Sequence, residues 1–207
     1  MAVKAPRLTD DLTISEMIYD GEDVIDRLFE GGTLENIAAA SLDFSGCFFR
    51  GVRFGECDAE RVYFTDCRFE GCDLSAFHFK EGALRRGAFV NCRATGTRFD
   101  HMILRDVAFE DCQLDYAALA DCKLQDVLFR DCRLRRAVWH TCTQKGLLLT
   151  DCDLESAEFT ATRMAGVDLS TCRLEGLRAA IDALRGSSVS LEQAPGILAM
   201  CEISVKM

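Results

Sequence analysis

Residues 42–56 read LDFSG CFFRG VRFGE, and the same five-residue phase continues without insertion or deletion to VDLST CRLEG at residues 167–176. The third place of a block is Leu or Phe in 22 of 27 blocks, and the exceptions are Ala59, Ala94, Trp139, Gln144 and Met164. The first place is small and mostly apolar, and it holds eleven of the twelve cysteines. A short repeat that continues over so much of a chain indicates a solenoid.

The period of five fits neither an amphipathic helix, which repeats apolar residues every three or four positions, nor a strand, which repeats them every two. Two inward places separated by two residues, followed by a step of three, fit a short extended piece that then turns a corner. Four such pieces close into a square coil. The sequence therefore predicts an all-β solenoid whose interior is filled with side chains.

The block pattern resembles that of the pentapeptide-repeat family, A(D/N)LXX, whose fold is a right-handed quadrilateral β-helix. The resemblance covers about two thirds of the chain and implies coils of 20 residues, in which residue n stacks on residue n+20. One column of centres then reads Phe49, Phe69, Phe89, Phe109, Phe129, Leu149, Leu169, and one companion column reads Cys72, Cys92, Cys112, Cys132, Cys152, Cys172. At about 4.8 Å per coil, roughly seven coils give a rod of about 34 Å.

The phase divides the chain into three segments. Residues 1–41 are acidic and irregular: Val24, Phe29 and Leu34 keep the centre phase, but Glu22 and Gly32 do not suit the companion places. We expect this segment to be a cap joined to the rod, because an uncovered rod end would expose strand edges. The β-helix is expected over residues 42–189, with Asp182 in an inward place, and a helix with a following strand over residues 190–207.

The carboxy-terminal segment has the pattern of a capping box, in which Ser190 accepts a backbone hydrogen bond and Gln193 reaches back. It predicts a helix from about Leu191, followed by an extended piece at residues 203–205. With the last coil, this ending resembles that of the Qnr-type quinolone-resistance proteins and their mycobacterial and albicidin-resistance relatives. In that family the module forms a two-fold dimer, which implies a homodimer here through Ile197, Leu198, Met200, Ile203 and Val205.

One departure from the family pattern leaves an alternative to the dimer. Proline removes a backbone hydrogen bond and glycine lowers helix propensity, so Pro195 and Gly196 affect the length of the predicted helix. The module could instead fold back over the last coil, with these two residues at the bend.

Composition limits the function classes. The 207 residues carry a net charge of −10 and contain no apolar run long enough to span a membrane. The first residues lack the layout of a secretion signal, so a cytoplasmic location is expected. The phased cysteines are expected to be reduced and buried, because column neighbours stand farther apart than a disulfide prefers, and Cys201 should react first with thiol reagents. Their spacing also sends them to different walls, which disfavours a zinc site.

Catalytic chemistry is not indicated. His78, His101 and His140 occupy outward places in separate coils, where solvated surface histidines are expected. No arrangement suggests a nucleophile with an activating base, and no glycine-rich phosphate loop is present, so we expect neither an enzyme nor a bound cofactor. Gln144 is the one polar centre. Because a buried amide without a partner costs about 1–3 kcal/mol, we expect it to find a backbone or water partner in a locally loosened coil.

The acidic charge is unevenly distributed. Residues 1–41 balance at −6, residues 42–177 at only −4, and residues 178–207 at zero. The best acidic candidate for a partner surface is the corner column Asp111, Asp131 and Asp151, with Asp121 and Asp126 on other corners. A structural role is the alternative, since an aspartate at a corner can bond the backbone N–H of its own turn.

The Qnr resemblance implies a mimic of duplex DNA that binds the type II topoisomerases DNA gyrase and topoisomerase IV and counters their inhibitors, without binding nucleic acid itself. The alternative is a scaffold for an unrelated protein partner, bound by the acidic amino-terminal segment or by a stripe of outward apolar residues. The stripe is Phe48, Ala88, Val90, Ala108, Leu128 and Leu148. Such a stripe can mark an interface, and cover by the amino-terminal segment is equally open.

Overall fold

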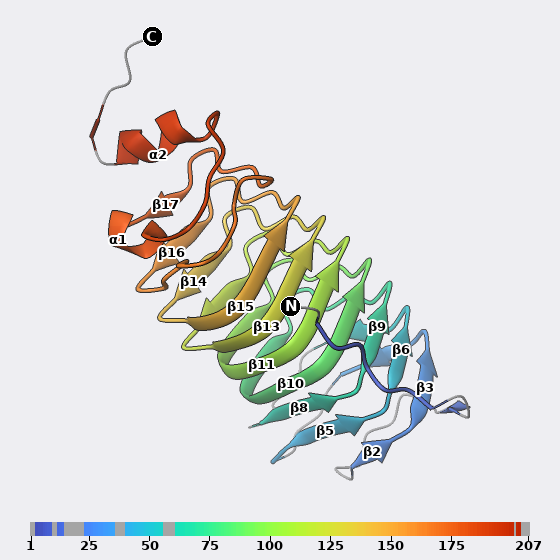
Figure 1. Cartoon of the computed structure of the whole chain (residues 1–207). Coiled ribbons are helices and arrows are strands. Elements are labelled where there is room, and N and C mark those ends of the chain that lie inside the picture. Colours follow the sequence, from blue (N-terminus) through green and yellow to red (C-terminus); the bar gives the residue numbers. More distant parts are fainter. Residues whose placement is uncertain are drawn as a thin grey trace.

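Parallel strand pairing builds the molecule, with an offset of 20 residues at every pair of strands except β1 with β3, where Thr13 pairs with Arg27. The computed structural model describes residues 3–9, 12–14, 23–35, 40–55, 61–200 and 202–203. Phe44 pairs with Val24 on one side and with Phe64 on the other. Each coil therefore stacks in register on the one before it, and the predicted right-handed four-sided β-helix is confirmed (Figure 1).

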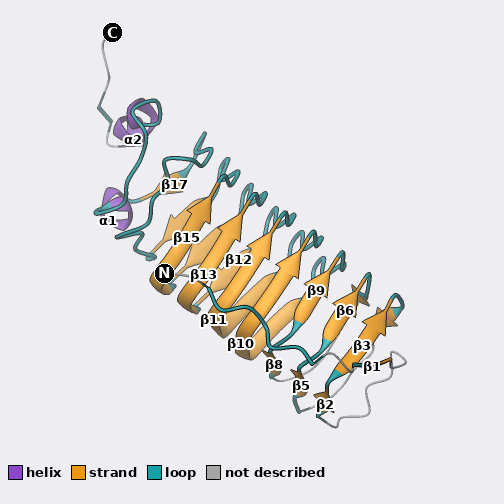
Figure 2. Ribbon diagram, turned by 45° about the vertical axis from the view of Figure 1, so that its right-hand side comes forward, coloured by secondary structure: helices purple, strands orange, loops and turns teal. Residues whose placement is uncertain are grey.

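Two adjoining walls carry the longest strands (Figure 2), and each wall is named after one of its centre residues. The Phe44 wall contains β2 (Val24–Ile25), β5 (Leu42–Ser45), β8 (Val62–Thr65) and parts of β10 (His78–Val90), β11 (Arg98–Glu110), β13 (Lys123–Arg130) and β15 (Thr143–Thr150). The Phe49 wall contains β1 (Thr13–Ile14), β3 (Arg27–Glu30), β6 (Phe48–Arg50), β9 (Arg68–Glu70) and the last parts of the same four long strands.

The other two walls are built from shorter pieces. The Leu114 wall contains β4 (Thr33–Leu34), β7 (Arg53–Phe54) and a row of single parallel bridges that starts at Arg53–Asp73. The Phe99 wall contains the first parts of β10 and β11, then β12 (Ala118–Ala120), β14 (Val138–His140), β16 (Glu158–Thr160) and β17 (Arg178–Ala179). Helices α1 (Ile181–Leu184) and α2 (Ala194–Met200) follow at the carboxy-terminal end of the rod (Figure 1).

The chain turns at the fifth place of the blocks, where the backbone enters the left-handed region. The φ angle is 62° at Gly71, 54° at Asp111 and 53° at Asp131. Glycine takes this conformation without a steric penalty, and Asp and Asn tolerate it better than other side chains. The corner N–H still has a partner, since that of Gly71 donates to the carbonyl of Val90 in the next coil at 3.0 Å. These corners explain why Gly, Asp and Asn recur in the fifth place.

The centre residues fill the interior as stacked ladders. The ring centroids of Phe69 and Phe89 lie 4.3 Å apart, and those of Phe89 and Phe109 lie 4.6 Å apart. None of the three side chains is more than 2% exposed. The rod is therefore a packed core, as the sequence predicts.

Small companion side chains donate hydrogen bonds to the neighbouring coil. The Cys112 thiol and the Thr97 hydroxyl each donate to a carbonyl 23 residues earlier, at 3.4 and 2.7 Å. All ten described cysteines are free and buried, which agrees with the prediction of reduced core thiols. Cys57 and Cys201 lie outside the described residues, so the expected order of thiol reactivity stays a prediction.

The coil begins before residue 42. Strands β2 and β3 pair with β5 and β6, and β4 pairs with β7. Val24, Phe29 and Leu34 therefore continue the centre columns of the rod, and the described part of the amino-terminal segment forms a first coil that is joined to it.

The other end departs from the predicted phase. Asp182 does not take an inward place: α1 leaves it exposed, in an ion pair with Arg185 at 3.0 Å, while Ala183 and Leu184 are buried. A carboxylate is too costly to bury without partners. The helical turn lets the chain continue the core with the two following apolar residues instead.

Gln144 lies where the strand ladder of the Phe44 wall stops. Its amide donates to the carbonyl of Arg163 at 3.2 Å and to that of Ala165 at 3.0 Å. Both carbonyls belong to the next coil, in which residues 162–164 form no strand. The prediction of a backbone partner in a locally loosened coil is confirmed.

Candidate functional site

Arginine partners neutralise much of the acidic charge on the walls. On the Leu114 wall, Asp153 contacts Arg135 at 2.6 Å and Arg173 at 3.6 Å, and Asp115 pairs with Arg133. Opposite charges at such distances cancel much of each other's field. A wall built in this way presents little net charge to a partner.

The corner column of Asp111, Asp131 and Asp151 is different. All three side chains are exposed, and none of their carboxylates forms a hydrogen bond or an ion pair with the described part of the chain. The neighbouring Arg130 contacts Glu110 instead, at 2.5 Å. The left-handed backbone explains an aspartate at each corner, whereas the bond from the carboxylate to its own turn is not formed. The column therefore offers three carboxylates without a close partner in the described chain, in successive coils about 4.8 Å apart, with Arg130 as a nearby cation beside Asp111 and Asp131.

The other two candidate carboxylates do not join this column. Asp121 is exposed at the corner between the Phe99 and Phe44 walls, and Asp126 is half-buried at the corner between the Phe44 and Phe49 walls. Both have left-handed φ angles, 54° and 52°. The structure thus separates the five candidates over three edges of the rod, and only one edge carries a continuous line.

The histidines do not form a site. His78 is half-buried and contacts Asp100 at 2.6 Å, whereas His101 and His140 are exposed as expected. Within the described ranges, no group of three or more His, Cys, Asp or Glu side chains is arranged to hold a metal ion. None of the described helices is long and apolar enough to cross a membrane.

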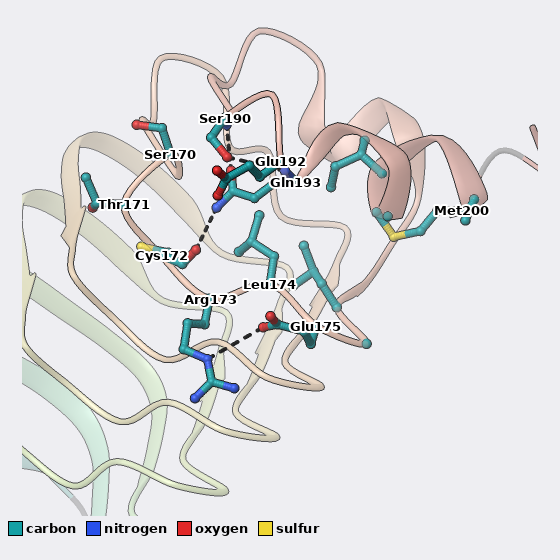
Figure 3. Close-up of a pocket in the computed structure, with 15 residues that line it drawn as sticks. Ser170, Thr171, Cys172, Arg173, Leu174, Glu175, Ser190, Glu192, Gln193 and Met200 are labelled. Atoms are coloured by element: carbon teal, nitrogen blue, oxygen red, sulfur yellow. Dashed lines mark hydrogen bonds and ion pairs between the residues drawn. The ribbon is translucent and has the colours of Figure 1, made fainter. Parts of the chain in front are cut away.

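A cleft of about 750 Å³ lies between α2 and the last coil (Figure 3). The predicted capping box is present: the Gln193 N–H donates to Ser190 Oγ at 3.3 Å, and the Ser190 N–H donates to Gln193 Oε1 at 2.6 Å. Gln193 Nε2 also donates to the carbonyls of Leu169 and Cys172, at 2.9 and 2.6 Å. One side chain therefore fixes the start of the module to the last regular coil.

The helix of the module is shorter than predicted. It begins at Ala194 rather than near Leu191, because the capping box holds residues 191–193 in a turn, with Leu191 itself 89% exposed. Pro195 lies in the first turn of α2, where a missing N–H is tolerated. Pro195 and Gly196 are thus accommodated within the helix.

The predicted dimer residues are only partly covered. Ile197 and Met200 line the cleft and pack against the core, whereas Leu198 and Ile203 are 36% and 52% exposed. Val205 lies outside the described residues. No residue of α2 is buried, so the helix presents apolar surface on the outside of the rod end.

The apolar stripe of the Phe49 wall is partly covered. Residues 3–6 border a cleft of about 360 Å³ whose floor includes Ala88, Val90, Ala108, Leu128 and Leu148. Cover by the amino-terminal segment, one of the two roles left open for the stripe, is therefore present, although Leu148 remains 40% exposed. Phe48 lies farther along the wall, where the Arg50 guanidinium stacks 4.8 Å above its ring.

Sequence reasoning missed the contacts that hold this segment. Lys4 and Arg7 reach Asp106 and Asp66, which occupy the same corner column two coils apart. The shared column was visible in the repeat phase. The contacts of Lys4 and Arg7 with this column could not be predicted, because residues 3–9 lie outside the repeat phase and the sequence gives no register for them against the rod.

Two sequence models of the pentapeptide repeat match this chain. One, described as a pentapeptide repeat region, matches residues 62–114 and 95–159, and the other, described as pentapeptide repeats (8 copies), matches residues 42–80 and 145–176. The chain belongs to the pentapeptide-repeat family. The repeat phase read from Leu42 to Gly176 is thus the family's own pattern. A comparison of this pentapeptide-repeat protein with curated protein sequences finds no match.

Solved pentapeptide-repeat structures share the fold. Full-length QnrB1, a plasmid-mediated fluoroquinolone resistance protein, is 16% identical with a TM-score of 0.54, over 86% of this chain and 99% of that chain. A trypsin-treated QnrB1 variant is 22% identical with a TM-score of 0.48, over 93% and 95%. HetL, which is involved in heterocyst differentiation regulation in the cyanobacterium Nostoc sp. strain PCC 7120, is 15% identical with a TM-score of 0.40, over 82% and 84%. The likeness to full-length QnrB1 establishes the fold alone.

Proposed function

We propose that this pentapeptide-repeat protein is a non-enzymatic binding protein that mimics the charge of duplex DNA and binds a type II topoisomerase, DNA gyrase or topoisomerase IV. The observation that carries the proposal is the line of carboxylates at Asp111, Asp131 and Asp151, which form no ion pair with the residues that the structure describes. An enzyme that binds DNA presents cations to the phosphates, and a rigid row of anions can occupy the same surface. QnrB1, which shares the fold, is a fluoroquinolone resistance protein, so a quinolone is the first inhibitor to test.

The proposed mimicry is one of shape more than of charge density. Duplex DNA carries one charge per about 1.7 Å of axis, whereas this edge carries one per coil, about 4.8 Å apart. The neighbouring Leu114 wall adds little, because its acids are paired with arginines. Binding should therefore weaken as the ionic strength rises, since exposed charges are screened within about 8 Å at physiological salt, but less steeply than the binding of DNA itself.

A second copy joined at the carboxy-terminal module would lengthen the acidic line. A two-fold contact buries the same patch on both copies, and each well-buried large apolar side chain contributes about 1.5–3 kcal/mol. Leu198 and Ile203 are exposed and available for such a contact. We therefore include a homodimer in the proposal, in the cytoplasm, where thiols stay reduced. Sedimentation of the intact chain tests it, and a monomer at micromolar concentration would contradict it.

The decisive experiment measures DNA supercoiling by gyrase, with and without a quinolone, at increasing concentrations of the protein. The proposal expects inhibition of supercoiling or recovery from the quinolone. The triple variant Asp111→Asn, Asp131→Asn, Asp151→Asn should need about tenfold more protein for the same effect, because it removes the charges that steer and hold the complex.

A matched variant removes the same total charge elsewhere. Asp23, Glu35 and Glu81 are exposed and lie away from both the corner column and the carboxy-terminal module, so their replacement by Asn or Gln should leave the effect within about twofold. Equal loss in both triple variants would show that only net charge matters. No effect of the native protein on either topoisomerase would favour the alternative, a scaffold for an unrelated protein partner.

A further inference from the structure

The amino-terminal segment Val3–Thr9 lies along the rod rather than around it. Figure 1 and Figure 2 show it crossing the long strands toward β3, on the face that carries their last parts. Two polar contacts hold it: Lys4 Nζ lies 4.0 Å from Asp106 Oδ2, and the Arg7 N–H donates to Asp66 Oδ1 at 3.0 Å. The segment is thus bound to one corner column of the rod.

The register of these two contacts follows from the geometry of extended chain and coil. An extended chain advances about 3.3 Å per residue, so three residues span about 10 Å, and two coils span nearly the same length. Lys4 and Arg7 are three residues apart, and Asp66 and Asp106 are two coils apart. Any extended segment with a basic residue and, three positions later, a free backbone N–H can therefore meet both carboxylates at once.

The two carboxylates are set up to receive cations. Asp106 is 6% exposed and accepts no hydrogen bond from the described residues; its ion pairs there are the long ones to Lys4 and to Arg105 at 3.8 Å. A buried carboxylate without close partners is costly, so it favours a nearby cation. Asp66 is oriented by Arg86, whose Nε and Nη2 donate at 2.6 and 2.5 Å. The side chain then presents an oxygen to the bound segment.

Beside this acidic edge the floor of the groove is mostly apolar and incompletely filled, and Arg68, Glu110 and Arg130 also line it. Val3 and Pro6 border the cleft of about 360 Å³ with Ala88, Ala108, Leu128 and Leu148. Leu148 keeps 40% of its surface exposed. An acidic edge and an apolar floor lie side by side, and the segment that occupies them has alternating basic and small apolar residues.

We propose that this groove is a docking site for an extended segment of a partner protein, with a basic residue, a residue other than proline three positions later whose backbone N–H is free to donate, and small apolar residues or proline between them. Val3–Thr9 is the resident occupant, and a partner segment of the same chemistry displaces it. Release is feasible because the Lys4 side chain is 65% exposed and surface ion pairs are weak. The tether gives the resident segment a high effective concentration, so it competes strongly with a free peptide. This site is independent of the acidic corner proposed to bind a topoisomerase.

The test uses the full chain and a fluorescent peptide of residues 2–9, AVKAPRLT, followed by anisotropy. In Lys4→Glu the resident segment is repelled by Asp106, while the carboxylates of the groove stay intact. The peptide should bind this variant at least about tenfold more tightly than the native protein, because the tethered competitor is removed. Arg7→Pro, which removes the N–H donated to Asp66, is a second releasing variant and should act in the same direction.

Release of the resident segment is measured separately, by the rate at which trypsin cleaves the bond between Arg7 and Leu8 in the Lys4→Glu variant and in the native protein.

The floor of the groove is tested with a matched pair of substitutions, each combined with Lys4→Glu, since Leu148 and Ile103 are each 40% exposed. Leu148→Glu, in the groove, should weaken peptide binding about tenfold, and Ile103→Glu, on the Phe44 wall, should leave it unchanged. Thermal unfolding of each variant confirms that the rod is intact.

Three results would overturn the proposal. Faster cleavage in Lys4→Glu without tighter peptide binding would show that the released groove does not bind the peptide. Equal effects of Leu148→Glu and Ile103→Glu would place the binding elsewhere. Dimers of the native protein that disappear in Lys4→Glu, with no peptide binding, would identify a second copy of this chain as the occupant.

Discussion

The rod has a phenylalanine half, residues 23–130, and a leucine half, residues 131–190, built on the same phase. In the first, the rings along the Phe49 wall stack with centroids 4.3–4.9 Å apart. In the second, leucine fills most centres, Trp139 is buried with its Nε1 unpartnered among the described residues, and Gln144 ends a strand ladder. The residues at the corner between the Phe44 and Phe49 walls also differ: the phenylalanine half has Asp66 and Asp106 there, and the leucine half has Gly146 and Gly166.

This difference shows that the repeat phase determines the shape of each coil, whereas the side chains at the centre places determine how stable that coil is. Stacked aromatic pairs add about 0.5–1.5 kcal/mol beyond the area that they bury. In a solenoid each repeat contacts only its neighbours, so such terms act locally and stability varies along the rod. We therefore expect the leucine half to open first, which hydrogen exchange can resolve coil by coil.

The largest expected effect is in the phenylalanine ladder. Phe89→Ala removes two ring contacts, at 4.3 and 4.6 Å, and leaves a cavity, so it should cost about 3–5 kcal/mol. Leu169→Ala, in the same column of the other half, should cost about 2–3 kcal/mol. Denaturant unfolding of both variants measures the difference. An equal or larger loss at Leu169 would contradict the assignment of higher stability to the stacked rings.

A smaller effect is expected where the ladder is interrupted. Gln144→Ala removes both hydrogen bonds to the next coil, and the carbonyls of Arg163 and Ala165 lose their donor, which should cost about 1–2 kcal/mol. Lys145→Ala, the exposed neighbour on β15, should change the unfolding free energy by less than about 0.5 kcal/mol. If the two variants behave alike, the amide does not hold the leucine half together.

The same contrast explains how much the sequence could predict. The inward positions of Phe109 and Cys112 follow from the phase alone. Phe109 is in the third place of its five-residue block and Cys112 is in the first place of its block, and the coil geometry points both of these places toward the interior. The prediction was wrong at Asp182, where the cost of burying a carboxylate exceeds the cost of breaking the coil. A pattern is informative only while each coil repeats the contacts of the one before.

The candidate surfaces divide in the same way. The corner places of Asp111, Asp131 and Asp151 were predictable, whereas their lack of partners was not, because side-chain rotamers decide which carboxylate each arginine reaches. The contact between Lys4 and Asp106 joins segments with no common period. It becomes visible only when the rise of the extended segment is compared with that of the coils.

A still smaller effect is expected at the rod end. Ser190→Ala removes the oxygen that accepts the Gln193 N–H, and should lower the local stability of α2 by about 0.5–1 kcal/mol. Gln193 keeps its bonds to Leu169 and Cys172, which limits the loss. Hydrogen exchange at the Ile197 N–H, which donates to the Gln193 carbonyl, reports it. Ser188→Ala, an exposed serine outside the capping box, serves as the control, and equal exchange in both would contradict the role of the box.

The smallest expected effect is the pH dependence that Asp66 contributes in the phenylalanine half. Burial alone raises the pKa of Asp66, but the hydrogen bonds from Arg86 and from the Arg7 N–H, with the charges of both arginines, outweigh it and lower the pKa below its usual value. A lowered pKa in the folded state stabilises the protein above the unfolded-state value of about 3.9, and this stability is lost as the pH falls through the folded-state value. Asp66→Asn keeps one oxygen for the Arg7 N–H, but it removes the charge and the second oxygen, which accepts from Arg86 Nη2. It should be less stable than the native protein by about 0.5 kcal/mol at pH 7, and the difference should close below about pH 4.

Denaturant unfolding from pH 7 to pH 3 measures the difference in unfolding free energy between Asp66→Asn and the native protein, and hydrogen exchange locates the coils in which it arises. A difference that does not narrow as the pH falls from 4 to 3, or that appears in coils near Gly166, would show that the charge of Asp66 is not its source.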